Sequence, residues 1–153
     1  MIQRKQTLYL LAAIVMTVIC LCMQIGSFQI SGLGGVARVY NLWYTALGKH
    51  YFDTWPLMAI LLPTAVIACY TIFIYHNRKT QALFCGLNAL LVVGWYICYF
   101  VVGQTVGDKS WGTVSFRPEW PAVLPAVALI LYLMAMRAIR ADERLVRSMD
   151  RIR

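Results

Sequence analysis

Five cysteines carry the most reactive side chains of this chain, and their spacing decides what chemistry they can perform. Cys20 and Cys22 are two residues apart, whereas Cys69, Cys85 and Cys98 are isolated along the chain. Enzymes that exchange disulfides depend on a Cys-x-x-Cys pair, because that spacing permits a reactive disulfide. Residues two apart on a helix point to different faces, so Cys20 and Cys22 are poorly placed to bridge. The spacing therefore argues against a thiol redox enzyme.

Other catalytic and metal-binding arrangements are equally weak in the sequence. His50 and His76 are expected on opposite faces of a membrane, and no group of Cys and His has the spacing of a metal site. No Ser–His–Asp arrangement is recognisable. We therefore expect no catalytic residue, no metal and no cofactor, and we interpret the protein as a non-enzyme.

The composition indicates the environment in which these residues lie. Of the 153 residues, 61% are apolar and 13% are charged, whereas soluble domains have about 45–50% and about 25%. Lys and Arg number 14 against 6 Asp and Glu, which gives a net charge of +8. A nucleic-acid-binding domain would carry such a charge on a polar, soluble surface, so we expect no nucleic-acid partner. The composition is typical of a small integral membrane protein.

Four apolar segments are long enough to cross the roughly 30 Å hydrocarbon core as helices, which takes about 20 residues each. They cover residues 8–25, 56–75, 82–102 and 121–139. We predict an all-α bundle of four transmembrane helices that forms a single domain. Its connections are an outer loop at 26–55, an inner loop at 76–81 and an outer loop at 103–120. The first apolar segment is longer than that of a signal peptide, so we interpret it as a retained span.

The distribution of Lys and Arg predicts the orientation of the bundle. Ten of the 14 lie in the N-terminus, in the 76–81 loop or in the segment from residue 137 onwards. Loops rich in Lys and Arg stay on the cytoplasmic side of a membrane. We therefore expect both termini in the cytoplasm.

The third predicted span combines small and polar residues. Gly86 lies four residues after Ala82, and Gly94 lies four residues before Cys98. This spacing lets two helix backbones approach closely, so we expect both glycines to pack against another helix. Asn88 lies between them and is expected to hydrogen-bond across helices. The four spans contain no Asp, Glu, Lys or His, which weighs against active transport.

The outer loops are rich in aromatic residues and are expected to form a small cap. The segments Val36–Tyr44 and Val114–Phe116 have strand propensity, and Gly107–Ser110 is typical of a hairpin turn. We predict a short sheet that joins the two loops. Such a cap is either a folded lid or a docking surface for a partner.

The C-terminal segment predicts a helix that continues beyond the last span. Residues 140–153 contain no Gly or Pro, and Leu145, Met149 and Ile152 recur near one helix face. One interpretation is adsorption of the basic segment to anionic lipid headgroups. The other is binding of a partner protein through the apolar face. The sequence favours neither over the other.

Motifs at the two chain ends resemble a known family. The start reads MIQR-x-Q-x-x-YLL over residues 1–11, and the end reads RAI-x-x-DE-x-LVRS-x-DRIR over residues 137–153. Both are similar to the ends of a family of short bacterial four-span proteins catalogued as domain of unknown function 4293. The resemblance implies a four-span protein of the bacterial inner membrane. It implies no catalytic residue.

Both motifs fall on the predicted cytoplasmic face, so we expect polar residues of the first motif to contact acidic residues of the second. The contact would join the first and fourth helices into one surface. We predict that this surface binds a partner. Its residues are Gln3, Arg4, Gln6, Asp142, Glu143, Leu145, Arg147, Met149, Asp150, Arg151, Ile152 and Arg153.

Two functions agree with these observations. The first is a non-enzymatic accessory or assembly subunit that docks onto a larger membrane complex through its helix faces and basic tail, with anionic lipids as further partners. The second is a small-solute channel or transporter that acts as an oligomer. The second function needs a polar lane across the bundle, for which the candidates are Thr17, Thr64, Thr71, Asn88 and Gln104.

Overall fold

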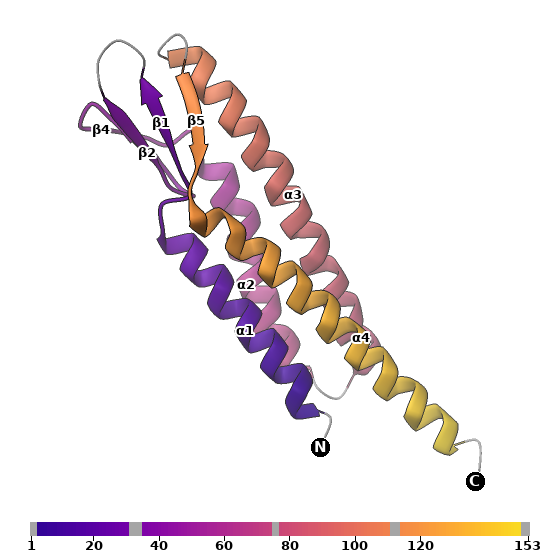
Figure 1. Ribbon diagram of the computed structural model, residues 1–153. Coiled ribbons are helices and arrows are strands. Elements are labelled where there is room, and N and C mark those ends of the chain that lie inside the picture. Colours follow the sequence, from indigo (N-terminus) through magenta and orange to yellow (C-terminus); the bar gives the residue numbers. More distant parts are fainter. Residues whose placement is uncertain (1–2, 31–34, 75–76, 111–113, 151–153) are drawn as a thin grey trace.

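A bundle of helices carries a small sheet at one end (Figure 1). The computed structural model describes residues 3–30, 35–74, 77–110 and 114–150. In this part of the chain the helices are α1 (Gln3–Cys22), α2 (Trp55–Phe73), α3 (Arg78–Ser110) and α4 (Leu124–Asp150). A short 3-10 turn, Trp120–Val123, leads into α4. Helices α1 and α3 each pack against both α2 and α4.

The sheet has five antiparallel strands drawn from both loops. They are β1 (Gly26–Ile30), β2 (Val36–Val39), β3 (Tyr44–Ala46), β4 (Lys49–Tyr51) and β5 (Val114–Pro118), in the spatial order β4-β3-β2-β1-β5. Strand β1 pairs with β2 from its own loop and with β5 from the later loop. The predicted sheet between the two loops is therefore confirmed, and the all-α fold class is wrong in this respect.

The predicted hairpin turn at Gly107–Ser110 is also wrong. Helix α3 continues through Ser110, well beyond the apolar segment from which its end was predicted. Strand β5 pairs with β1 instead of with a neighbour in its own loop. Polar residues are compatible with a helix that has left the apolar layer, so hydropathy alone could not place its end.

A two-residue turn that the sequence did not predict connects β3 to β4. Ala46 pairs with Lys49, and Leu47 and Gly48 between them have φ values of 51° and 76°. Positive φ at both residues is typical of the type I′ turn, whose twist matches that of the paired strands. Glycine adopts this conformation readily, but leucine is strained in it, so the usual Asn-Gly signal is missing here.

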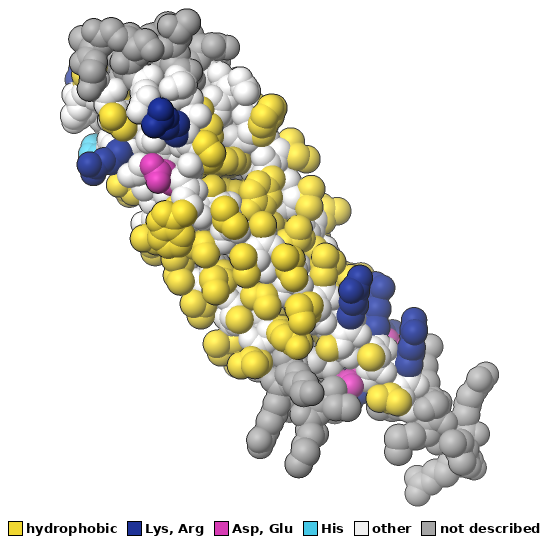
Figure 2. Space-filling view, in the orientation of Figure 1, with side chains coloured by type: hydrophobic (Ala, Val, Ile, Leu, Met, Phe, Trp, Pro, Cys, Tyr) yellow, Lys and Arg dark blue, Asp and Glu magenta, His cyan; other side chains and the backbone are white. Residues whose placement is uncertain are grey.

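The exterior of the bundle is apolar along much of its length (Figure 2). In the described part of the chain, three helical stretches are long and apolar enough to cross a membrane: Trp55–Phe73, Arg78–Val106 and Trp120–Leu145. The corresponding stretch of α1, Gln6–Cys22, is shorter. The end of the bundle that carries both chain termini is called the terminal end, and the opposite end is called the sheet end (Figure 1).

The buried residues of the helices follow a regular spacing. Along α2 they are Leu57, Leu61, Thr64, Ala68 and Thr71. Along α4 they include Ala128, Tyr132, Ala135, Ile139 and Asp142. Steps of three and four residues keep one narrow stripe of each helix toward its neighbours, as in antiparallel bundles. Half of these residues are Ala or Thr, whose small side chains let the helices pack closely and gain dispersion contacts.

Asn41 connects three helices at the sheet end. Its side-chain Nδ2 donates to the Cys20 carbonyl near the end of α1 at 2.7 Å, and its Oδ1 accepts from the Trp95 indole of α3 at 3.1 Å. Its backbone carbonyl accepts from the Met58 N–H in the first turn of α2 at 3.2 Å. Both Asn41 and Trp95 are buried. One loop residue therefore satisfies polar groups of α1, α2 and α3.

The ring of Phe116 on β5 lies between two glycines. A Cβ atom at Gly26 of β1 would lie 2.7 Å from this ring, and a Cβ atom at Gly103 of α3 would lie 3.1 Å from it. A side chain at Gly26 would force this ring to move, and one at Gly103 would contact it tightly. The close approach fixes the sheet against α3.

We expect Asn41→Ala to lower the free energy of unfolding by about 3 kcal/mol, because the Trp95 N–H and the Cys20 carbonyl would stay buried without this partner. Chemical denaturation in detergent micelles measures the change. The exposed Gln104→Ala serves as the control and should change the stability by less than about 0.5 kcal/mol. Equal effects of the two substitutions would contradict the role of Asn41.

Candidate functional site

A buried hydrogen bond joins the two family-like ends of the chain at the terminal end. The Gln6 Nε2 of α1 donates to the Asp142 carboxylate of α4. The two side chains are only 5% and 6% exposed. The expected contact between the first and the second motif is therefore present. Hydrogen bonds to an ionised carboxylate are stronger than neutral ones, so this bond fixes α4 beside α1.

Other residues of the predicted partner surface belong to the same two helices. Gln3 and Arg4 begin α1, whereas Arg147, Met149 and Asp150 lie in the last turns of α4. Arg151, Ile152 and Arg153 lie outside the described residues, as does His76. Gln6 and Asp142 are occupied by each other inside the bundle. The partner-binding role of their neighbours stays a prediction.

Helix α4 extends past the other helices at the terminal end (Figure 1). It is a single helix of 27 residues, so the predicted continuation of the fourth span into a C-terminal helix is confirmed. Arg144 on this extension is exposed, and Leu145 is 55% exposed. An exposed leucine beside an arginine on a projecting helix is suited to contact with another molecule.

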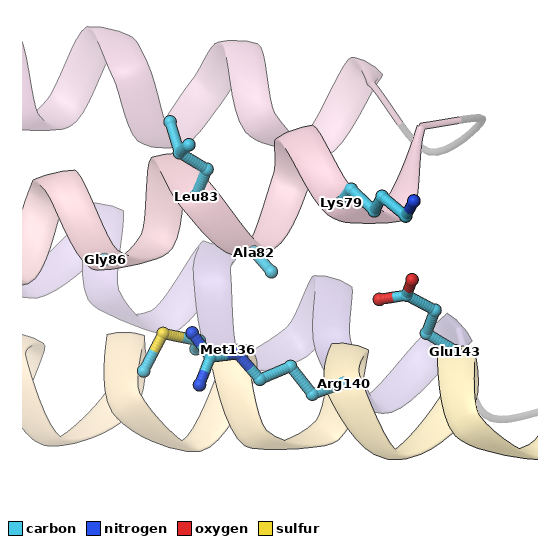
Figure 3. Close-up of a pocket in the computed structure, with 7 residues that line it drawn as sticks. All are labelled: Lys79, Ala82, Leu83, Gly86, Met136, Arg140 and Glu143. Carbon is cyan, nitrogen blue, oxygen red and sulfur yellow. The ribbon is translucent and has the colours of Figure 1, made fainter.

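A groove of about 340 Å³ lies between α3 and α4 near the same end (Figure 3). Apolar and small residues line one part of it, and charged residues line the other. Its lining consists of Lys79, Ala82, Leu83, Gly86, Met136, Arg140 and Glu143. The groove was not predicted, because it needs the pairing of two helices that lie far apart in the sequence.

The two glycines predicted to pack against other helices behave differently. A Cβ atom at Gly86 would lie 3.7 Å from the Met136 sulfur of α4, so Gly86 does face another helix. A Cβ atom at Gly94 would meet no atom within 4 Å in the described part of the structure. The helix-packing prediction for Gly94 is therefore wrong, whereas the half-buried Cys98 packs against a buried cluster that includes Ile25 and Trp95.

Asn88 is buried in the bundle as expected, but the predicted hydrogen bond across helices is absent. Neither of its side-chain polar atoms has a partner within the described residues, and the same holds for the Tyr132 hydroxyl. The buried threonines cannot serve Asn88 as donors. Thr17, Thr64 and Thr71 each donate to a carbonyl of their own helix, at 2.6 to 2.8 Å.

Asn88 and Tyr132 lie at similar levels of the bundle. Gly86 of α3 faces Met136 of α4, which sets the register of the two helices. Asn88 is two residues and Tyr132 four residues further toward the sheet end, or about 3 Å and 6 Å along the helix axes. Both are fully buried. The middle of the bundle thus contains an amide and a hydroxyl whose hydrogen-bonding capacity is unused in the described structure.

No disulfide joins the cysteines in the described part of the chain. All five are free thiols, of which Cys20 and Cys85 are buried while Cys22 and Cys69 are exposed. The described residues contain no group of three or more His, Cys, Asp or Glu that could hold a metal ion.

We expect Gln6→Leu to lower the free energy of unfolding by about 1–3 kcal/mol, because it leaves the buried Asp142 carboxylate without its donor. The double variant Gln6→Leu/Asp142→Leu should recover most of that loss, since apolar replacement of both partners is nearly neutral. Chemical denaturation of the four proteins in detergent gives the complete cycle. Additive effects of the two substitutions would contradict the coupling.

Comparison with known proteins agrees with the resemblance of the chain ends. The model of the family described as domain of unknown function (DUF4293) matches residues 2–152. No curated protein matches the chain. The family match covers both ends of the bundle, including the Gln6–Asp142 contact and the loops that form the sheet. This protein therefore belongs to the DUF4293 family.

Proposed function

We propose that this protein is a non-enzymatic accessory or assembly subunit that docks onto a larger complex in the bacterial inner membrane. The observation that carries the proposal is the extension of α4 beyond the bundle, with Leu145 exposed on it. The Gln6–Asp142 bond holds the base of this extension against α1. A helix fixed at its base needs to lose little conformational freedom on binding, which favours affinity.

The proposed arrangement in the membrane has four spans and both termini in the cytoplasm. Three stretches have the length and hydropathy for a span, and α1, with 20 residues, is about 30 Å long. Support for the orientation comes from the basic residues of the terminal end, because such residues are enriched on the cytoplasmic side. The α4 extension would then reach into the cytoplasm, where the partner complex is expected to present its surface.

A photo-crosslinking amino acid at position 145 tests the docking surface in living cells. We expect one heteromeric adduct with a membrane protein, joined through a cytoplasmic segment of that protein. The matched control is position 47, where Leu47 is also exposed but lies at the sheet end. Adducts with lipid alone, or the same adduct from both positions, would contradict the proposal. An adduct through a periplasmic segment would contradict the orientation.

The alternative is a small-solute channel or transporter that acts as an oligomer. The observation in its favour is the unused hydrogen-bonding capacity of Asn88 and Tyr132 in the middle of the bundle. Against it, the threonines of the proposed lane donate to their own helices, and Gln104 is exposed.

The substitution Asn88→Leu separates the two functions. For an accessory subunit, we expect it to raise the free energy of unfolding by about 1–3 kcal/mol, because a buried polar group without partners is removed. We also expect no glycerol permeability in vesicles that contain either protein, as measured by osmotic shrinkage. A channel would instead make the vesicles permeable, and Asn88→Leu would change the rate. Thr105→Val, at an exposed position, is the control.

A further inference from the structure

The groove between α3 and α4 combines the two features that a phospholipid needs. Its apolar part is formed by Ala82, Leu83 and Gly86 of α3 together with Met136 of α4. Lys79 from α3 and Arg140 from α4 add two cationic groups near the terminal end. An acyl chain fits the apolar part, and a phosphate fits the cationic part.

The position of the groove along the helices agrees with a lipid headgroup. Its residues span 79–86 of α3 and 136–143 of α4, at the terminal ends of the two apolar stretches Arg78–Val106 and Trp120–Leu145. A headgroup lies at this border between hydrocarbon and water. The groove therefore opens at the depth where a phosphate would lie.

The two cationic side chains of the groove are accessible. Lys79 and Arg140 are both exposed. The Arg140 side chain extends along α4 toward Met136 (Figure 3). An arginine that extends toward the apolar part of a membrane helix needs an anionic partner there, because an unpaired charge is costly in hydrocarbon.

The local charge favours an anion over a zwitterion. Residues 77–81 and 137–145 contain five basic and two acidic side chains. Asp142 is buried against Gln6, and Glu143 lies on the side of the groove nearer to Lys79 (Figure 3). The guanidinium group of Arg140 lies at the other side, next to the apolar residues. An arginine recognises a phosphate through two parallel hydrogen bonds, so Arg140 is suited to the phosphodiester.

We propose that the α3–α4 groove binds one anionic phospholipid, with its phosphate held by Arg140 and one acyl chain lying over Gly86 against Met136. The site differs from the docking surface at Leu145 and does not require it. Gly86 is essential to the shape, because a larger side chain would extend into the groove beside Met136.

Native mass spectrometry of the purified full chain in neutral detergent tests the site, with phosphatidylglycerol as the probe and phosphatidylcholine as the zwitterionic comparison. We expect one retained phosphatidylglycerol per protein and weaker retention of phosphatidylcholine. Arg140→Gln should weaken phosphatidylglycerol binding at least about tenfold, because it removes the charge and the paired donors that hold the phosphate. Arg144→Gln removes an equal charge one turn away, outside the groove, and should leave binding unchanged.

A second pair of variants tests the apolar part without changing the charge. Gly86→Leu should abolish the retained lipid, whereas Gly94→Leu, at an open position of the same helix, should not. Millimolar inorganic phosphate should leave the lipid bound. Equal effects of the paired variants, or displacement by phosphate, would overturn the site. These outcomes are independent of crosslinking at position 145, so the lipid site and the docking function can fail separately.

Discussion

The requirement that every buried backbone group find a hydrogen-bond partner governs the sheet end of this protein. Helix α1 ends after Cys22, and the carbonyls of its last turn have no partner within the helix. The Asn41 side chain donates to the Cys20 carbonyl. Asn41 also accepts hydrogen bonds from the Trp95 indole and the Met58 N–H. These hydrogen bonds connect the loop that forms the sheet to three of the helices.

The terminal end is held by a different hydrogen bond from the sheet end. The middle of the bundle relies on close packing instead. The Gln6–Asp142 bond joins the first and last helices, which are neighbours in space but not in sequence. Between the ends, the helices pack closely through small residues. The threonines there donate hydrogen bonds to carbonyls of their own helix and not to another helix. Asn88 and Tyr132 are buried polar residues of that middle region, and the side-chain polar atoms of Asn88 find no hydrogen-bond partner within the described residues. Hydrogen bonds between elements therefore stabilise the two ends of the bundle, and close packing stabilises the middle.

The sequence predicted features that depend on local composition and missed those that depend on pairing. Apolar segments located all four helices, and the absence of Gly and Pro predicted the continuous α4. The end of α3 at Ser110 was missed, because polar residues outside the membrane are compatible with both helix and turn. Which glycine packs against another helix depends on how the helices are aligned. Gly86 faces Met136 while Gly94 faces no other helix, although both have a small neighbour four residues away. The α3–α4 groove depends on the same register.

The ring of Phe116, held between Gly26 and Gly103, has a mechanical consequence. Because this ring of β5 packs against both β1 and α3, the sheet can move relative to α3 only if the ring leaves its position. A force applied to the strands would therefore also act on α3, the 33-residue helix that begins at Arg78.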